Sequence, residues 1–227
     1  MQRKTKQPNN LFTMKRTLEI SIFLWLCLPI SKLINRINWR LGRPYGCKSI
    51  STEPIKKQLQ PGMVILTHRN YECSSLFIPG YWTHAAIVVN SDQIIDATRK
   101  GVCAHSVESF LSTVDDFIVL KPNFCCQKMM EYAGSLVSNL VGYPFSFDFQ
   151  NSNKTFYCSG LVCYVYISSI NRQKSIAIPD LLQNYLDGFI IKPEDFYTNN
   201  DIWQIIHSHH SLSGQFGPEI NNRSCIN

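Results

Sequence analysis

The sequence predicts an α+β domain in which a mostly antiparallel sheet packs against helices. Short apolar runs bounded by Gly, Pro, Asn or Asp follow one another closely between residues 63 and 120, a pattern typical of consecutive antiparallel strands. Two longer segments, about 125–140 and from 158 onward, instead carry apolar residues at helical spacing. With 227 residues, of which only 17% are charged, the chain can bury a substantial core.

The strand-rich half begins after a turn signal at Gln60-Pro61-Gly62. A buried strand is expected over 63–67, and a hairpin is expected where residues 84–89 and 93–98 flank a turn at 90–92. Three further elements complete this half of the chain. They are a short strand from residue 101, a helix over 107–112 and a strand over 117–120, which Pro122 ends.

The second half is expected to be mainly helical. A helix begins near Cys158, because Leu161, Val162 and Val165 recur at offsets of three, four and seven from it. The preceding helix, over about 125–140, presents a core stripe formed by Met129, Ala133, Leu136, Val137 and Leu140. After the Cys158 helix we expect a looser stretch over 176–185, a strand at 189–191, a helical turn at 193–196 and a closing strand at 202–206.

The two ends of the chain differ from this central region. Residues 1–17 are polar and basic and are expected to be disordered. Residues 18–55 are apolar and basic, but their longest apolar run, 18–30, covers about 13 residues where a membrane-spanning helix needs roughly 20. We interpret this segment as an interfacial membrane anchor or as a helix that packs on the domain. The domain itself is expected over 56–206, followed by a disordered tail over 207–227.

Charge and cysteine usage exclude several classes of function. The net charge is +6, but most of the excess precedes residue 45, where Glu19 is the only acid. The remainder is close to neutral and shows no nucleic-acid footprint. The 9 cysteines form no C-x-x-C pair, which argues against a structural zinc site, so we expect no metal and no other cofactor. Reduced thiols favour a cytoplasmic or membrane-associated setting.

Three residues far apart in the sequence have the chemistry of a cysteine-nucleophile site. Cys158 is expected in the first turn of its helix, where unpaired backbone N–H groups and the helix dipole favour a thiolate. His84 begins a predicted strand, and Asp96 lies on the partner strand, where a carboxylate could orient the imidazole. A two-residue hairpin loop would point Asp96 away from His84, whereas a three-residue loop or a bulge would place both on one face. The alternative is that Cys158 is a small buried core residue.

The residues around these positions form four motifs, namely Pro61-Gly62…Leu66-Thr67, Phe77-Ile78-Pro79-Gly80-Tyr81-Trp82-Thr83-His84-Ala85-Ala86-Ile87, Ile94-Ile95-Asp96-Ala97-Thr98 and Phe156-Tyr157-Cys158-Ser159-Gly160-Leu161-Val162. In this order, over roughly residues 56–206, they resemble the permuted papain-like amidases of the YaeF/YiiX type, within the NlpC-like superfamily of cysteine peptidases. The resemblance implies a circularly permuted papain-like fold. It also implies that Cys158 is the nucleophile, His84 the general base and acid, and Asp96 the residue that orients the imidazole.

The chain departs from the pattern of these amidases at three places. Met63 stands where an aspartate is usual, and Phe145-Ser146 stands where a Tyr-Asp pair is common. Gly160 replaces a glutamate that is common two residues after the cysteine. None of the three departures removes a member of the triad, but the last two lie near the predicted site and could alter substrate choice or activity.

Three functions are compatible with these residues. The leading one is a cysteine hydrolase that cleaves an amide bond of a small peptide or an isopeptide through a thioester acyl-enzyme. The second is a lipid-directed thiol acyltransferase or phospholipase, held at a membrane surface through residues 18–43. The third is a binding module that keeps the fold with weak catalysis. For the enzymatic functions we predict that Tyr81, Tyr157 and Ser159 contact the small peptide or acylated substrate.

Overall fold

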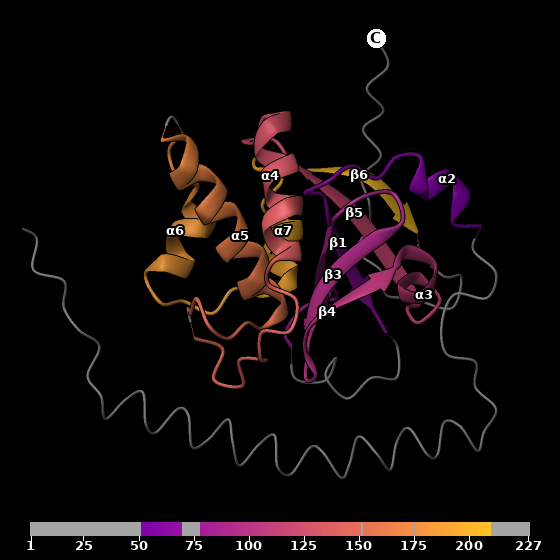
Figure 1. Cartoon of the computed structure of the whole chain (residues 1–227), viewed down its shortest axis with the longest axis horizontal. Helices are drawn as coiled ribbons and strands as arrows, with labels where there is room; N and C mark the ends of the chain where they lie inside the picture. Colours follow the sequence, from indigo (N-terminus) through magenta and orange to yellow (C-terminus); the bar gives the residue numbers. More distant parts are fainter. Residues whose placement is uncertain (1–50, 70–77, 151, 175, 210–227) are drawn as a thin grey trace, which may run out of the picture.

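The computed structural model describes residues 51–69, 78–150, 152–174 and 176–209 (Figure 1). The basic segment predicted to be disordered and nearly all of the candidate membrane anchor lie outside these residues, as does the tail beyond residue 209. Within the parts of the chain that the structure describes, no helix is long and apolar enough to cross a membrane.

Six strands form one antiparallel sheet, which confirms the predicted fold class. Their order across the sheet is β4-β3-β2-β1-β5-β6. Neighbouring strands pair antiparallel throughout. The strands are β1 (Val64–His68), β2 (His84–Val88), β3 (Gln93–Thr98), β4 (Gly101–Ser106), β5 (Asp116–Pro122) and β6 (Trp203–His209).

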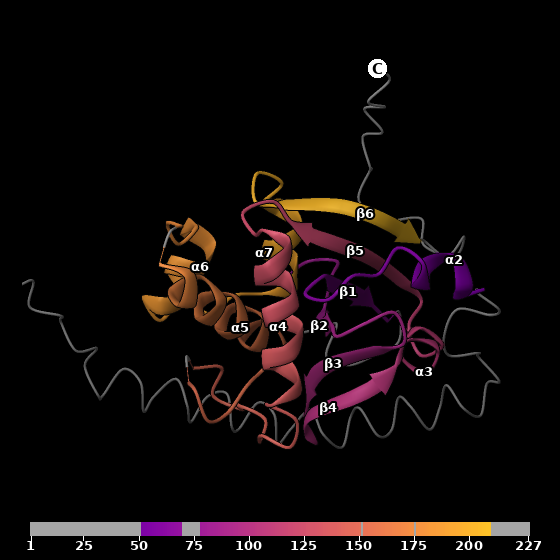
Figure 2. The ribbon, with the colours of Figure 1, turned by 45° about the horizontal axis from the view of Figure 1, so that its top comes forward.

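Helices cover both faces of this sheet, as Figures 1 and 2 show. One face carries α4 (Gln127–Ser138), α5 (Cys158–Gln173), α6 (Asp180–Leu186) and α7 (Pro193–Thr198), and the other carries the short helices α2 (Glu53–Lys56) and α3 (Val107–Leu111). The central helix of the larger layer is α5, which contacts β2, β3, α4 and α6. This helix therefore packs on the part of the sheet formed by β2 and β3.

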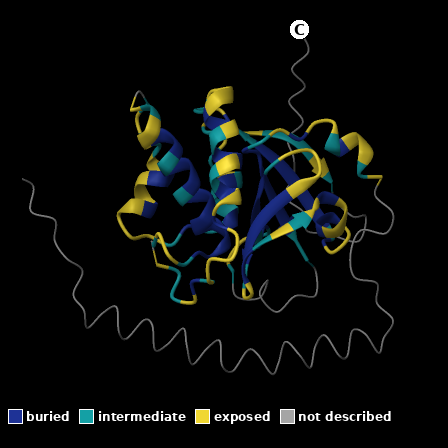
Figure 3. Cartoon of the chain, viewed as in Figure 1, coloured by how far each residue is buried: buried dark blue, intermediate teal, exposed yellow. Residues whose placement is uncertain are grey.

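The core has two parts because side chains of a strand alternate between the two faces of the sheet. In β1, Val64 and Leu66 join the cluster beneath α4 and α5, whereas Ile65 joins the cluster beneath α2 and α3. Figure 3 shows that successive residues of the central strands are buried, and because their side chains alternate between the two faces, both faces are covered. Double burial explains why the strands appear in the sequence as continuous apolar runs rather than as alternating apolar and polar residues.

The strand predicted at 189–191 is wrong. Gly188 has a φ of +91°, which turns the chain, and the side chain of Phe189 is 64% exposed. The backbone N–H of Ile191 donates to the hydroxyl of Tyr157 at 3.2 Å. This segment thus connects α6 to α7 and binds the helix layer through a side chain instead of joining the sheet.

Other elements differ from their predicted lengths. The stretch predicted to be loose contains α6, which buries Leu181 and Leu182 against the core. β4 continues to Ser106, and β6 continues to His209, so residues 207–209 belong to the sheet and not to a disordered tail. The rings of His207 and His209 stack on Phe117, which gives this part of the chain a packed partner.

Candidate active site

Cys158 is the first residue of α5, as the apolar spacing predicts. Tyr157, before it, is extended, and the first helical turn contains no acidic residue. The predicted stripe of Leu161, Val162 and Val165 is buried and holds the helix against the sheet. The unpaired N–H groups and the positive end of the helix dipole therefore lie at the sulfur. Cys158 is 9% exposed, so it sits at the boundary of the core.

His84 and Asp96 lie on the same face of the sheet. His84 is the first residue of β2, and Asp96 on β3 pairs with the residue two positions beyond His84. The backbone N–H of Val89 donates to the carbonyl of Gln93 at 2.9 Å, which leaves a three-residue loop at 90–92. The longer of the two alternative loops is therefore the one present, and it gives Asp96 the orientation that contact with His84 requires.

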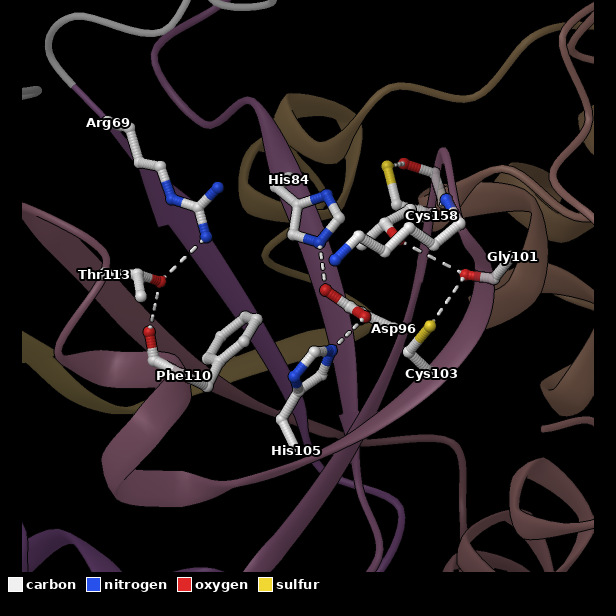
Figure 4. A network of polar contacts seen from close by, with 12 residues as sticks. Arg69, His84, Asp96, Gly101, Cys103, His105, Phe110, Thr113 and Cys158 are labelled. Carbon is white, nitrogen blue, oxygen red and sulfur yellow. Dashed lines mark hydrogen bonds and ion pairs between the residues drawn. The ribbon is translucent and has the colours of Figure 1, made fainter. Parts of the chain in front are cut away.

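The His84 ring lies between Cys158 and Asp96 (Figure 4). Its Nε2 is 2.8 Å from Oδ2 of Asp96, a carboxylate that is only 3% exposed. An ionised carboxylate can only accept hydrogen bonds, so Nε2 carries a hydrogen. The other ring nitrogen, Nδ1, lies on the side of Cys158, and the imidazole and the thiol shift each other's pKa. Three residues from distant parts of the chain thus form one connected group.

The pKa values of Cys158 and His84 are shifted in opposite directions. Burial alone would raise the pKa of the Cys158 thiol, but its hydrogen bond and attraction to His84, together with the Ala85 backbone N–H, lower that pKa below its ordinary value. Burial opposes protonation of His84, yet the hydrogen bonds to Asp96 and Cys158 outweigh it and raise the His84 pKa to about 10. These opposite shifts favour a thiolate–imidazolium pair at neutral pH.

The carboxylate of Asp96 also binds a second imidazole, which is not among the residues predicted for the site. Nε2 of His105, on β4, lies 3.0 Å from Oδ1 of Asp96. Burial favours the neutral carboxyl, but the hydrogen bonds from His105 and His84 hold the pKa of Asp96 well below its usual range. A tight turn at Arg99-Lys100 pairs Thr98 with Gly101. Counting outward from it places Cys103 opposite Asp96, and it places His105 two residues further along β4, on the same face of the sheet as Asp96.

The three residues predicted to contact the substrate differ in exposure. Tyr81 is partly exposed, and its hydroxyl donates to the buried Asp116, while its ring stacks on His68 with centroids 4.3 Å apart. Tyr157 and Ser159 are buried. Contact between a substrate and either of these two side chains would require the residues that cover them to move.

Two of the departures noted in the sequence contact the residues directly before Cys158, because Gly160 lies against Tyr157 and the backbone N–H of Ser146 donates to the carbonyl of Phe156 at 3.0 Å. A Cβ atom on Gly160 would come within 2.6 Å of the Tyr157 ring, which occupies the space that a side chain at this position would need. Ser146 is buried, and its hydroxyl donates to Asp148 at 2.7 Å, so a carboxylate two residues further on lies beside this position. Met63 is packed in the core beneath α2 and α3 and so lies away from Cys158.

Across residues 51–209, apart from the undescribed gaps, no group of three or more His, Cys, Asp or Glu side chains is arranged to hold a metal ion. The chemistry that the arrangement itself offers is nucleophilic attack by a thiolate with an adjacent imidazolium as proton donor.

Comparisons with known proteins identify the family. Residues 58–206 match the family described as permuted papain-like amidase enzyme, YaeF/YiiX, C92 family. The crystal structure of metalloprotein yiiX from Escherichia coli O157:H7, DUF1105, has the same fold, with a TM-score of 0.53 and 14% identity over 67% of this chain and 99% of that chain. No curated protein matches the sequence. The family match spans more than half of the chain, so the chain belongs to the permuted papain-like amidases of the YaeF/YiiX type.

Proposed function

We propose that the protein is a cysteine hydrolase that cleaves an amide bond of a small peptide or an isopeptide. Cys158 would act as nucleophile, His84 as general base and acid, and Asp96 as the residue that orients the imidazole. The observation that carries this proposal is the position of the His84 ring, which is bonded to Asp96 through Nε2 and faces Cys158 through Nδ1. A buried structural cysteine would need neither partner.

The reaction follows from this arrangement. The Cys158 thiolate attacks the carbonyl carbon, and the new C–S bond moves an electron pair onto the carbonyl oxygen. The backbone N–H of Cys158 can donate to that oxyanion, a contribution worth roughly 3 kcal/mol. Protonated His84 gives its Nδ1 hydrogen to the leaving nitrogen as the C–N bond breaks, which leaves a thioester. Water then attacks the thioester, His84 takes a proton from that water, and the acid and the thiolate are released.

A lipid-directed acyl transfer or phospholipase reaction is the second candidate. Its support is the segment between α4 and Cys158, which exposes Tyr143 and Phe147, the latter to 49%. Exposed aromatic side chains in a segment that leads to the nucleophile would suit an acyl chain better than a polar peptide. The chemistry would be the same, with an ester oxygen in place of the leaving nitrogen.

Alkylation with iodoacetamide tests whether Cys158 is activated by His84. Cys126 is a matched internal control, because it also lies at a helix N-terminus, is exposed, and has its pKa lowered by the backbone N–H of Met129. We expect peptide mass spectrometry to show that His84→Ala slows the alkylation of Cys158 and leaves that of Cys126 unchanged. Equal effects on both thiols, or no effect on Cys158, would leave a binding module as the remaining interpretation.

Incubation of the enzyme with muropeptides and with a diacyl phospholipid in parallel separates the two reactions. A hydrolase of amides should release free amine from the peptide mixture, and Cys158→Ala should abolish the release. Release of fatty acid or transfer of an acyl chain, without peptide cleavage, would replace the first candidate by the second.

A further inference from the structure

We propose that His105 is a positioning residue that holds Asp96 in place, so that the working unit is Cys158, His84, Asp96 and His105. This inference rests on the proposed function, because it assigns His105 a role in activating the same thiolate. His105 would not touch substrate. It would act through Asp96 on the His84 imidazole.

The geometry gives each oxygen of Asp96 its own imidazole. Oδ2 accepts from Nε2 of His84 at 2.8 Å, and Oδ1 accepts from Nε2 of His105 at 3.0 Å. The three residues come from the adjacent strands β2, β3 and β4. A carboxylate that accepts two charge-assisted hydrogen bonds from opposite sides has little freedom to rotate, so the direction of its bond to His84 is fixed.

Phe110 from α3 supports the same arrangement from behind. Its ring lies 6.3 Å from that of His84 and 6.2 Å from that of His105, and the residue is 3% exposed. Figure 4 shows Phe110 beside the two imidazoles, with Asp96 between them. A buried aromatic wall on this side excludes water, which strengthens the hydrogen bonds of the carboxylate and raises the cost of leaving one oxygen unpaired.

The other titratable group opposite Asp96 does not take the place of His105. Cys103 on β4 pairs directly with Asp96 in the sheet, but its thiol is directed to the carbonyl of Gly101, 3.5 Å away. His105 itself is one third exposed at its side chain, with 33% of it accessible. Its imidazole can therefore be replaced without opening the core, which makes the residue suitable for substitution.

Two substitutions separate the hydrogen bond of His105 from its packing. His105→Gln keeps an N–H donor that can reach Asp96, whereas His105→Phe keeps a ring that can pack on Phe110 but has no donor. The measurement is the rate constant for iodoacetamide alkylation of Cys158 as a function of pH, with thermal unfolding followed by circular dichroism. His207→Ala, on β6 at the far side of the sheet, serves as the matched control.

We expect His105→Phe to slow alkylation at neutral pH by on the order of 10-fold and to move the acidic limb of the pH profile upward. His105→Gln should retain most of the wild-type rate, and His207→Ala should match the wild type. His105→Ala replaces the phenylalanine variant if that variant does not fold. A pH profile of His105→Phe that coincides with the wild-type profile, or equal losses of rate in His105→Gln and His105→Phe, would overturn the inference.

The wild type and His84→Ala distinguish this outcome from failure of the proposed function. If His84→Ala abolishes the fast alkylation of Cys158 while His105→Phe leaves it intact, the triad stands and the role of His105 does not. If the wild-type thiol is already as slow as that of His84→Ala, the thiolate is not activated and both proposals fall.

Discussion

Replacement of Asp96 by asparagine tests the electrostatic basis of the site. Asparagine keeps the size of the side chain but exchanges one carboxylate oxygen for an NH2 donor. Both oxygens of Asp96 now accept an imidazole N–H, from His84 and from His105. Either orientation of the amide would therefore bring two donors together, and the negative charge that stabilises the imidazolium would be lost.

The size of the effect follows from the hydrogen bond that is lost. A hydrogen bond to a charged group contributes about 1.5–3 kcal/mol, which corresponds to a factor of roughly 10 to 150 in rate. We expect the alkylation rate of Cys158 at pH 7 to fall by such a factor. In the wild type the pKa of Cys158 is lowered and that of His84 is raised to about 10. A thiolate and an imidazolium therefore coexist at pH values above the lowered Cys158 pKa and below the raised His84 pKa. Without the charge of Asp96 the His84 pKa falls and the Cys158 pKa rises, and the pH range narrows from both ends.

The assay is the alkylation rate of Cys158 over the full pH profile. Asp92→Asn is the matched control, because Asp92 lies in the hairpin loop before the same strand and pairs at 2.8 Å with Lys56 on the surface, far from the imidazoles. It should reproduce the wild-type profile. An Asp96→Asn profile with unchanged limbs and an unchanged rate would refute the view that Asp96 sustains the ion pair.

Three further perturbations have expected outcomes. Glu194→Ala should lower the free energy of unfolding in urea by about 1.5–3 kcal/mol, because Oε2 of Glu194 accepts the Trp82 backbone N–H at 2.9 Å. Glu194→Gln keeps an acceptor, and an equal loss in both variants would contradict this reason. Gly160→Ala should cost about 1–3 kcal/mol in the same assay through overlap with the Tyr157 ring, and an unchanged midpoint would show that the ring yields freely. The folded-state pKa of Asp96 lies below its unfolded value of about 3.9, so the carboxylate contributes stability above that pH and loses it on acidification. The wild type should therefore lose more stability between about pH 5 and pH 3 than Asp96→Asn does.

The start of α5 and the start of β2 could be predicted because both depend on local signals. The apolar spacing after Cys158 defines a helical face with few alternatives, and the face it predicts is the one that α5 buries. His84 opens a strand whose partner follows within a few residues, so their pairing costs little loop entropy. The sequence could not decide on which face of the sheet the Asp96 side chain lies, because a change of one residue in the length of the hairpin loop moves that side chain to the opposite face.

The rest of the site depends on contacts between distant segments. The bond between His105 and Asp96 requires the register of β4 in addition to that of β3, so two pairings must be known together. The segment at 189–191 has strand-like composition, but the Ile191 N–H is satisfied by the hydroxyl of Tyr157, a residue 34 positions earlier. Tertiary contacts of this kind override local propensity and leave no periodic signal in the sequence.

The glycine at position 160 bears on the charge of Cys158, the proposed nucleophile. The family pattern commonly has a glutamate here, in the first turn of the helix that begins at Cys158. A carboxylate at that place would lie within one turn of the sulfur, and like charges raise the pKa of a thiol. In this chain the first turn carries no acid, and the ring of Tyr157 fills the space above Gly160. The positive end of the helix dipole therefore acts on Cys158 without a competing negative charge, so this departure favours the thiolate instead of weakening it.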